Sequence, residues 1–422
     1  MKDDPFKIAE GAPGTKARWA VILCCMGAYF FDSYDMYILG ITMQEILTDL
    51  HMTTVQGGLL SSATMLGAVI GCVFLGRFAS NWGNKLALVV CTAWIGVGSL
   101  AVVFVSSFWA WFFLRIFTGM GIGGIMGPIH ALIWQHWGPG HRAKITGLTF
   151  STFPIAGIVA SFAGKLMLVV DFRWIFVSAG LSLVVALIAQ FAIPDDRHLV
   201  PAGAAKGTAK AKKVQFKDII MGNYKWITLF AIFASFANMA ACWAMNTWIP
   251  SWLMTDRGLD VSQMTNFAML NYFGGLVGYL LWGVIGSKVG SGRAMVAAYG
   301  LSAVALLLYI MLPGGDYLLL LGPLLYFGQG GCGCLNSILF AEAYPERIRA
   351  YGSGTTFNVG RVGSIISPYT VALVGSSLGL TAGLLMAPAF FAFGALVSVF
   401  LNRFIGRQQA LEEAEGLPVE KP

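Results

Sequence analysis

Long apolar runs separated by short polar turns dominate this chain of 422 residues. A helix that crosses a bilayer needs about 20 mostly apolar residues, and twelve runs come close to that length or exceed it. We predict helices over 19–42, 56–78, 86–106, 108–133, 145–168, 173–193, 226–253, 264–286, 294–312, 317–341, 352–375 and 380–403. The pattern therefore predicts an all-α membrane protein with twelve transmembrane helices.

The composition agrees with that class of protein. Apolar residues make up 57% of the chain and charged residues 11%, against about 45–50% and about 25% in ordinary soluble domains. This excess of apolar surface argues against a soluble enzyme, a disordered chain and a nucleic-acid-binding domain. We expect membrane lipid, and no nucleic acid, as a partner. The seven cysteines lie in apolar runs without CxxC spacing, so we interpret them as packing residues rather than a metal site.

The 27 Lys and Arg residues outnumber the 20 Asp and Glu residues, which gives a formal charge of +7. With both termini inside, only Lys165, Arg173 and Arg257 face outward, while Arg115 and Arg361 fall within helices. The remaining 22 of the 27 basic residues then face the cytoplasm. This asymmetry predicts cytoplasmic termini and suits a bacterial-type inner membrane.

The two halves of the chain repeat at a constant offset of 207 residues. Matched pairs include Trp19 with Trp226 and Gly83 with Gly290. We therefore predict two pseudo-symmetric six-helix bundles, over 1–193 and 226–422, the second ending in a short cytoplasmic tail. A Lys-rich cytoplasmic linker over 194–225 would join them. Transporters built from such repeats bind their substrate near the midplane, between the halves.

Three stretches give the chain a resemblance to the major facilitator superfamily. They are the turn 76–85, the helix segment 115–124 and the turn 342–349. The first turn resembles the superfamily's loop motif, with Ser80 in place of its usual acidic residue. The resemblance implies the major facilitator fold. It also implies gate or conformational roles for Gly76, Arg77, Gly83, Lys85, Glu342, Arg347 and Arg349.

The first helix carries a narrower resemblance. The run Asp32-Ser33-Tyr34-Asp35, followed by Gly40, is similar to the Asp-Gly-Phe-Asp signature of the aromatic acid–proton symporters. The segment 360–368 resembles a pattern that the same group carries in its eleventh helix. The resemblance implies proton-coupled uptake of an aromatic or other carboxylate.

Buried charges are the first candidates for chemistry, because a charge at the bilayer centre costs at least about 2.5–3.5 kcal/mol. Asp32 and Asp35 share one helix face. Asp35 and Arg115 lie about 10 Å and about 9 Å below the same membrane surface. That depth permits an ion pair between them and leaves Asp32 free. A carboxylate that gains and loses a cationic partner can bind and release a proton. The alternative, for Arg115 above all, is a static pair that fastens two helices.

The second half offers groups for a substrate. Arg361 suits a carboxylate through its planar bidentate geometry, or else forms a gate or packing pair, for instance with Glu342. The other candidates are Trp243, Asn246, Tyr272, Tyr326, Gln329 and Asn336. Aromatic walls with a few amides suit a flat organic acid, although ordinary packing is the alternative for each. Cys242 occupies the repeat position of Asp35, which suggests protonation in the first half and substrate binding largely in the second.

We therefore expect a secondary active transporter that takes up a small organic anion with protons by alternating access. Its coupling ion is the proton, and we expect no other cofactor, no metal and a monomeric chain. We do not expect an enzyme, because the sequence offers no nucleophile–base pair. An anion exchanger or facilitator of the same fold, without proton coupling, is the alternative. A membrane receptor that transports nothing is a remote one.

Overall fold

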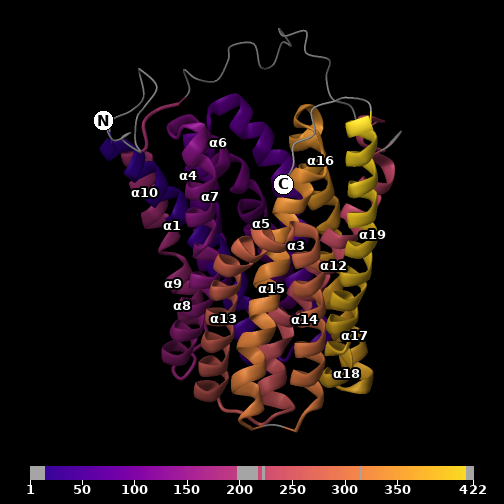
Figure 1. Ribbon diagram of the computed structural model, residues 1–422. Helices are drawn as coiled ribbons and strands as arrows, with labels where there is room; N and C mark the ends of the chain where they lie inside the picture. Colours follow the sequence, from indigo (N-terminus) through magenta and orange to yellow (C-terminus); the bar gives the residue numbers. More distant parts are fainter. Residues whose placement is uncertain (1–14, 197–216, 221–223, 314, 415–422) are drawn as a thin grey trace. The chain divides into compact units, whose positions relative to one another are not determined.

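A computed structural model describes residues 15–196, 217–220, 224–313 and 315–414, apart from a few side chains near helix ends (Figure 1). Every regular element in these ranges is a helix. Each of the twelve predicted runs coincides with one helix or with two consecutive helices separated by a short break. Ten spans within the described ranges are long and apolar enough to cross a membrane. The all-α membrane fold is confirmed.

The chain divides into two compact units, and unit 1 comprises Met1–Leu39 and Ala63–Lys210. Its helices are α1 (Thr15–Ile41) up to Leu39, α3 (Thr54–Trp82) from Ala63, α4 (Asn84–Val102), α5 (Phe108–Gly124), α6 (Met126–His136), α7 (Pro139–Phe150), α8 (Thr152–Met167), α9 (Arg173–Ala179) and α10 (Ser182–Ala192). Helix α4 is the central one, because it packs against α5, α6, α9 and α10. It therefore brings residues from several helices to one place.

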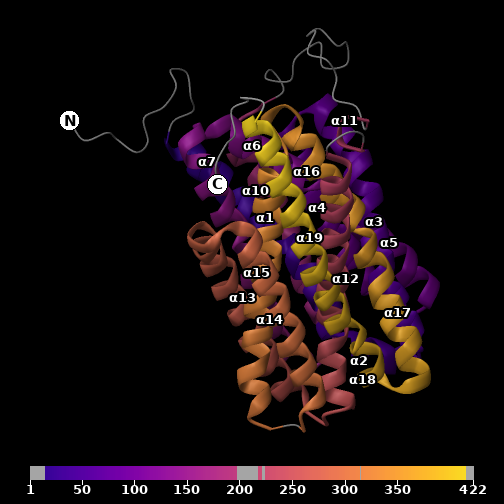
Figure 2. The same ribbon diagram turned by 45° about the vertical axis from the view of Figure 1, so that its right-hand side comes forward.

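Unit 2 comprises Gly40–Ser62 and Ala211–Pro422. Its helices are α2 (Met43–Asp49), α11 (Lys217–Ile220), α12 (Lys225–Thr255), α13 (Val261–Val289), α14 (Ser291–Met311), α15 (Tyr317–Glu342), α16 (Glu346–Gly360), α17 (Val362–Leu378), α18 (Leu380–Leu384) and α19 (Met386–Ala414). Helices α13, α14 and α15 run side by side (Figures 1 and 2). Helix α12 packs against α17 and α19.

These units differ from the bundles proposed from the sequence over 1–193 and 226–422. Residues 40–62 belong to unit 2, because Gly40 lies against the Asn246 carbonyl of α12 and Gly58 against α17. The linker expected over 194–225 also contains structure, since α11 lies within it and Thr228 donates a 2.6 Å hydrogen bond to the Ile219 carbonyl. Residues 197–216 lie outside the described ranges.

Close helix contacts recur at the offset of 207 residues. A Cβ at Gly123 would overlap the Ala68 carbonyl oxygen, and a Cβ at Gly330 would overlap the Gly275 carbonyl. The same offset relates Gly67–Ile116 to Gly274–Pro323, Gly71–Met120 to Gly278–Phe327, and Gly121–Cys91 to Gly328–Ala298. Small residues allow membrane helices to approach this closely. The repeat read from the sequence is thus a repeat of packing.

Large apolar side chains lie on the outside of both units. Phe104 and Phe191 of unit 1 are 85% and 82% exposed, and Leu320 of unit 2 is 72% exposed. Exposing so much apolar surface to water is unfavourable, whereas contact with lipid tails is favourable. The seven cysteines, all within the described residues, form no disulfide with one another, and five of them are buried, as expected for packing residues.

Candidate functional site

Asp35 of α1 is fully buried inside unit 1. One of its carboxylate oxygens, Oδ2, accepts a 3.1 Å hydrogen bond from Nη1 of Arg115 on α5, and the two side chains form an ion pair with 0% exposure on both sides. The other, Oδ1, accepts a short hydrogen bond from the hydroxyl of Ser99 on α4. Three helices therefore meet at one carboxylate. The pair that helix depth permits does form.

Arg115 is held by aromatic rings as well as by Asp35. Its guanidinium carbon lies 5.2 Å from the ring centroid of Phe176 and 5.9 Å from that of Trp111. A cation above an aromatic face is attracted to its negative electron density. Nε and Nη2 of Arg115 are buried and have no hydrogen-bond partner among the described residues. The guanidinium therefore retains donors for a further oxygen atom.

Asp32 and Tyr34 extend this site along α1. Asp32 is 5% exposed and lies within electrostatic reach of Cys91, so the expectation that it stays free does not hold. The Tyr34 hydroxyl and the Ser178 hydroxyl of α9 are 2.7 Å apart. Hydrogen bonds from α1 therefore reach α4, α5 and α9. Asp35 itself bonds to α4 and α5, and Tyr34 makes the contact with α9.

Unit 2 holds an uncharged polar cluster at the equivalent place. Cys242 of α12 stands 207 residues after Asp35, and its sulfur accepts hydrogen bonds of 3.2 Å from Asn246 Nδ2 and from Gln329 Nε2 of α15. The Tyr326 hydroxyl donates to Asn246 Oδ1 at 3.1 Å. The Tyr272 ring of α13 meets the Tyr326 ring edge to face, with centroids 5.2 Å apart. Four sequence-predicted substrate residues thus converge.

The remaining predicted substrate residues lie apart from this contact set. Asn336 donates to the Tyr299 hydroxyl at 3.2 Å, and Tyr299 donates to the Ala234 carbonyl, an arrangement that fastens α15, α14 and α12. Trp243 is 8% exposed on α12. Arg361 stands at the break between α16 and α17, with its guanidinium 5.5 Å from the Phe357 ring centroid.

The unit 1 ion pair has no charged counterpart in unit 2. The positions 207 residues after Asp35 and Ser99 hold Cys242 and Leu306, and the position after Arg115 holds Gly322. A Cβ at Gly322 would overlap Oδ1 of Asn271, so an amide occupies the space there. The buried ion pair thus lies in unit 1, and the neutral polar cluster around Cys242 lies in unit 2.

The turn at Gly83 contains several of the predicted gate residues. Gly83 has a φ of 94° and Gly290 has a φ of 92°, values that favour glycine, and each precedes a helix. Asp196 caps the first of these helices by accepting hydrogen bonds of 2.8 Å from Asn84 N and 3.2 Å from Lys85 N. Negative charge is favourable at a helix N-terminus.

At the second of these helix starts, Glu342 accepts a short hydrogen bond from the Ser291 hydroxyl. Carboxylates from different elements therefore hold the two equivalent turns. Glu342 does not pair with Arg361 in this arrangement, so the alternative of a Glu342–Arg361 pair is not what the structure shows.

The turns before α7 and α16 share an arginine contact. Arg142 Nε donates to the Trp137 carbonyl at 2.9 Å, and Arg349 Nε donates to the Tyr344 carbonyl at 3.2 Å. Both the donors and the acceptors are 207 residues apart. Arg349 therefore holds its turn as Arg142 does. The side chain of Arg347 lies outside the described residues.

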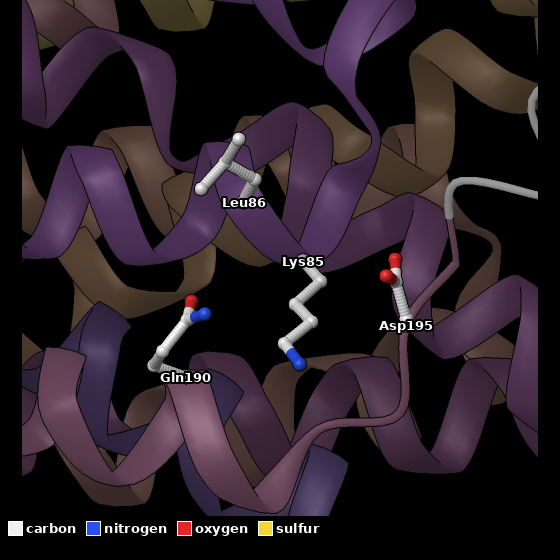
Figure 3. A pocket seen from close by; sticks show the side chains of 4 residues that line it. All are labelled: Lys85, Leu86, Gln190 and Asp195. Atoms are coloured by element: carbon white, nitrogen blue, oxygen red, sulfur yellow. The ribbon is translucent and has the colours of Figure 1, made fainter.

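Lys85 also lines a small pocket between the ends of α4 and α10, shown in Figure 3. Its side chain extends between Gln190 and Asp195, with Leu86 nearby. The pocket's volume of about 30 Å³ is far below the roughly 300–1,000 Å³ typical of ligand pockets. Gly76 and Arg77 lie near the end of α3, where Gly76 faces open space and Arg77 is exposed. This end of unit 1 offers polar contacts rather than a substrate cavity.

A comparison with protein families identifies the fold. The model of the Major Facilitator Superfamily matches residues 25–368, which is most of the chain. The chain belongs to the major facilitator superfamily. The resemblance carried by its turns and its buried arginine is confirmed. Because this is a family of membrane transporters, the chain is an integral membrane protein of that class and not an enzyme.

Several transport proteins are similar to this chain along nearly their whole length. The gentisate transporter of Corynebacterium glutamicum is 26% identical over 401 residues, covering 93% of this chain and 88% of the relative. The cis,cis-muconate transport protein of Acinetobacter baylyi is 26% identical, with 89% and 92% covered. The gallate transporter of Pseudomonas putida is 23% identical, with 92% and 93% covered.

A solved structure supports the same fold. The crystal structure of a bacterial homologue of the human lysosomal transporter Spinster, in an inward-facing and unoccupied conformation, matches with a TM-score of 0.73. It covers 93% of this chain and 99% of that chain at 15% identity. This likeness shows the major facilitator fold.

Sequence reasoning missed several contributors to these sites, among them Ser99, Phe176 and Cys242. Ser99 and Phe176 contact the Asp35–Arg115 pair, but each lies in an apolar run where serine and phenylalanine are ordinary packing residues. Cys242 was recognised as the repeat position of Asp35 but not as a hydrogen-bond acceptor. The two amides placed near it, Asn246 and Gln329, were the available signal.

Proposed function

We propose that the chain imports a small aromatic carboxylate together with protons, across a bacterial inner membrane and with both termini in the cytoplasm. The relatives named for gentisate and gallate transport support an aromatic carboxylate, and the relative named for cis,cis-muconate, an open-chain dicarboxylate, supports carboxylates more widely. The excess of Lys and Arg in the segments assigned to the cytoplasm supports the orientation. We infer a monomer in which two bundles, over 1–193 and 226–422, alternate in exposing one site.

The observation that carries the proposal is Asp35, buried between Ser99 and Arg115. A buried ion pair is weak evidence for a purely stabilising role, because apolar side chains of similar volume are often as stable. A carboxylate beside a cation stays ionised, and it binds a proton more readily once the cation moves away. Asp35 would thus take up a proton in one state of the cycle and release it in another, with Asp32 sharing the task.

We assign the substrate largely to unit 2. Its carboxylate would meet Arg361, which stands where α16 gives way to α17, and interrupted helices are typical of transporter binding sites. The ring would lie against the aromatic and amide groups of Trp243, Asn246, Tyr272, Tyr326 and Gln329. One proton carried with one monoanion is electrically neutral, so the pH gradient alone would drive accumulation.

Uptake of labelled gentisate into proteoliposomes tests the proposal. With an acidic exterior, the wild type should accumulate gentisate, and Asp35→Asn should reduce accumulation at least about 10-fold. The matched control is Asp171→Asn, which removes the carboxylate of a partly exposed ion pair with Arg173 at 3.5 Å. Equal accumulation by wild type, Asp35→Asn and Asp32→Asn would contradict the proposal.

An anion exchanger is the second candidate, and the open donors of Arg115 favour it. Nε and Nη2 could bind an oxygen of the substrate directly, without any proton step. Such a protein would show uptake accelerated by internal substrate and would not respond to a pH gradient. Under the main proposal the pH gradient is required.

A further inference from the structure

The cluster around Cys242 contains two strong donors that share a weak acceptor. Asn246 Nδ2 and Gln329 Nε2 both lie 3.2 Å from the Cys242 sulfur. The three side chains are 3–6% exposed, so water does not readily supply a better partner. Sulfur is a weak acceptor, and an amide N–H gains more from an oxygen. The two amides are therefore held in place for an oxygen atom.

Every side chain in this contact set is uncharged. Asn246 also accepts from Tyr326, whose ring meets Tyr272 edge to face. Burying a carboxylate here would cost several kcal/mol because the set contains no cation. A neutral hydroxyl suits it better, since it can accept from an amide N–H and also donate to a phenolic oxygen, which has two lone pairs.

We propose that the Cys242–Asn246–Gln329 cluster, with Tyr326, binds a hydroxyl group on the ring of the aromatic substrate. On binding, the hydroxyl oxygen replaces the thiol as the acceptor for the two amides, while the two tyrosine rings contact the substrate ring. The cluster then selects hydroxylated aromatic acids over their unsubstituted counterparts. The inference rests on the proposed function, because it specifies the substrate of that transporter.

A site built to hydrogen-bond a hydroxyl discriminates strongly against a ligand that lacks it, since its own polar groups are then left poorly paired. The probes are benzoate, 3-hydroxybenzoate and 2,5-dihydroxybenzoate, with binding to the detergent-solubilised full chain measured by calorimetry. We expect at least one hydroxylated acid to bind about 10–100-fold more tightly than benzoate. No pH gradient is needed, so the result is independent of proton coupling.

Two substitutions at the amides locate the effect. Gln329→Leu and Asn246→Leu should each reduce the ratio of the affinity for the hydroxylated acid to the affinity for benzoate to within about 3-fold of unity. The matched control is Asn358→Leu, which replaces an exposed amide on α16 that donates to the Gly354 carbonyl. The control should keep the wild-type ratio.

Two substitutions at the thiol should act in opposite directions. Cys242→Ala removes the acceptor that competes with the ligand, so preference for the hydroxylated acid should rise. Cys242→Ser supplies a stronger competing acceptor, so the preference should fall. If Cys242 had only a structural role, each substitution would change the affinities for benzoate and for the hydroxylated acid by the same factor.

Equal affinity of the wild type for benzoate and both hydroxylated acids would overturn the inference and leave the proposed transport function intact. An unchanged ratio in Gln329→Leu and Asn246→Leu would also overturn it. Failure of the wild type to bind any of the three acids would overturn both the inference and the assigned substrate class.

Discussion

Asp35 and Arg115 form an ion pair whose two side chains are both fully buried, with 3.1 Å between Oδ2 and Nη1. Removing one partner leaves an uncompensated buried charge, which typically costs about 3–5 kcal/mol. We expect Asp35→Asn to lower the free energy of unfolding by about that amount, read as a lower Tm in detergent. Asp171→Asn should leave Tm unchanged, and equal Tm values for both variants would contradict this account of the pair.

Removing both charges should separate the structural role of the pair from its role in transport. In Asp35→Leu with Arg115→Met neither charge remains, so stability should return to within about 1–2 kcal/mol of the wild type. Transport should not return, because no carboxylate remains at position 35 to bind the proton. If the double variant folds and accumulates substrate as the wild type does, the ion pair has only a structural role, which is to hold α1 and α5 together.

The membrane potential should have little effect on uptake of a monoanion. Each net charge moved would be worth about 2.3 kcal/mol per 100 mV, whereas one proton with one monoanion moves none. Initial uptake at a fixed pH gradient should therefore change less than about 2-fold when a potassium diffusion potential of 100 mV is imposed. A rise that grows steeply with the potential would require additional protons per cycle.

Two glycines on the helices of unit 1 should differ sharply in their tolerance of alanine. A Cβ at Gly123 would overlap the Ala68 carbonyl, whereas a Cβ at Gly76 meets nothing within 4 Å. We expect Gly123→Ala to cost about 1–3 kcal/mol or more, and Gly76→Ala to be neutral or to stabilise by about 0.5–1 kcal/mol. Thermal unfolding monitored by size-exclusion chromatography distinguishes the two. A stable Gly123→Ala would show that the helices can separate without cost.

Glu45 on α2 should make stability depend on pH. Burial raises the pKa of Glu45, and its Oε2 has no hydrogen-bond partner among the described residues. Because the folded-state pKa exceeds the unfolded one, the proton is held more tightly in the folded chain. Stability from this group is therefore fully present below the unfolded pKa and is lost as the pH rises through the folded pKa.

Glu45→Gln should accordingly raise Tm at pH 7 and have no effect near pH 4. Asp49→Asn, which changes an exposed carboxylate on the same helix, is the matched control. If Glu45→Gln lowered Tm at pH 7, the ionised carboxylate would be making a favourable contact.

Hydropathy was enough to predict the helices, because lipid requires long apolar segments whose backbone bonds are internal. It did not predict the breaks at Ile125, Ser151 and Arg361, since a break of a single residue hardly changes the hydropathy of a window of about 19 residues. Nor could it place residues 40–62 in unit 2. That grouping depends on backbone contacts at Gly40 and Gly58, which leave no trace in hydropathy.

The sequence predicted those site residues whose burial in a membrane is costly, such as charged ones. It did not predict residues that are common in membrane helices. Asp35 and Arg115 were recognisable because a charge inside the bilayer is costly and is kept only where it has a partner or a function. Ser99 did not, because a serine in a helix can satisfy itself, as Ser161 does with the Gly157 carbonyl at 2.9 Å. The sequence predicted Asn246 and Gln329 as substrate-binding residues, but not that both amides would donate to one sulfur.

Proton entry driven by substrate is the most direct test of coupling through Asp35. Proteoliposomes at equal internal and external pH contain a pH-sensitive dye, and gentisate is added outside. The account predicts faster acidification of the lumen with the wild type than with protein-free liposomes, which report passive entry of the acid. Asp35→Asn should match the protein-free rate. Gentisate uptake by the wild type with no acidification beyond the passive rate would contradict proton coupling.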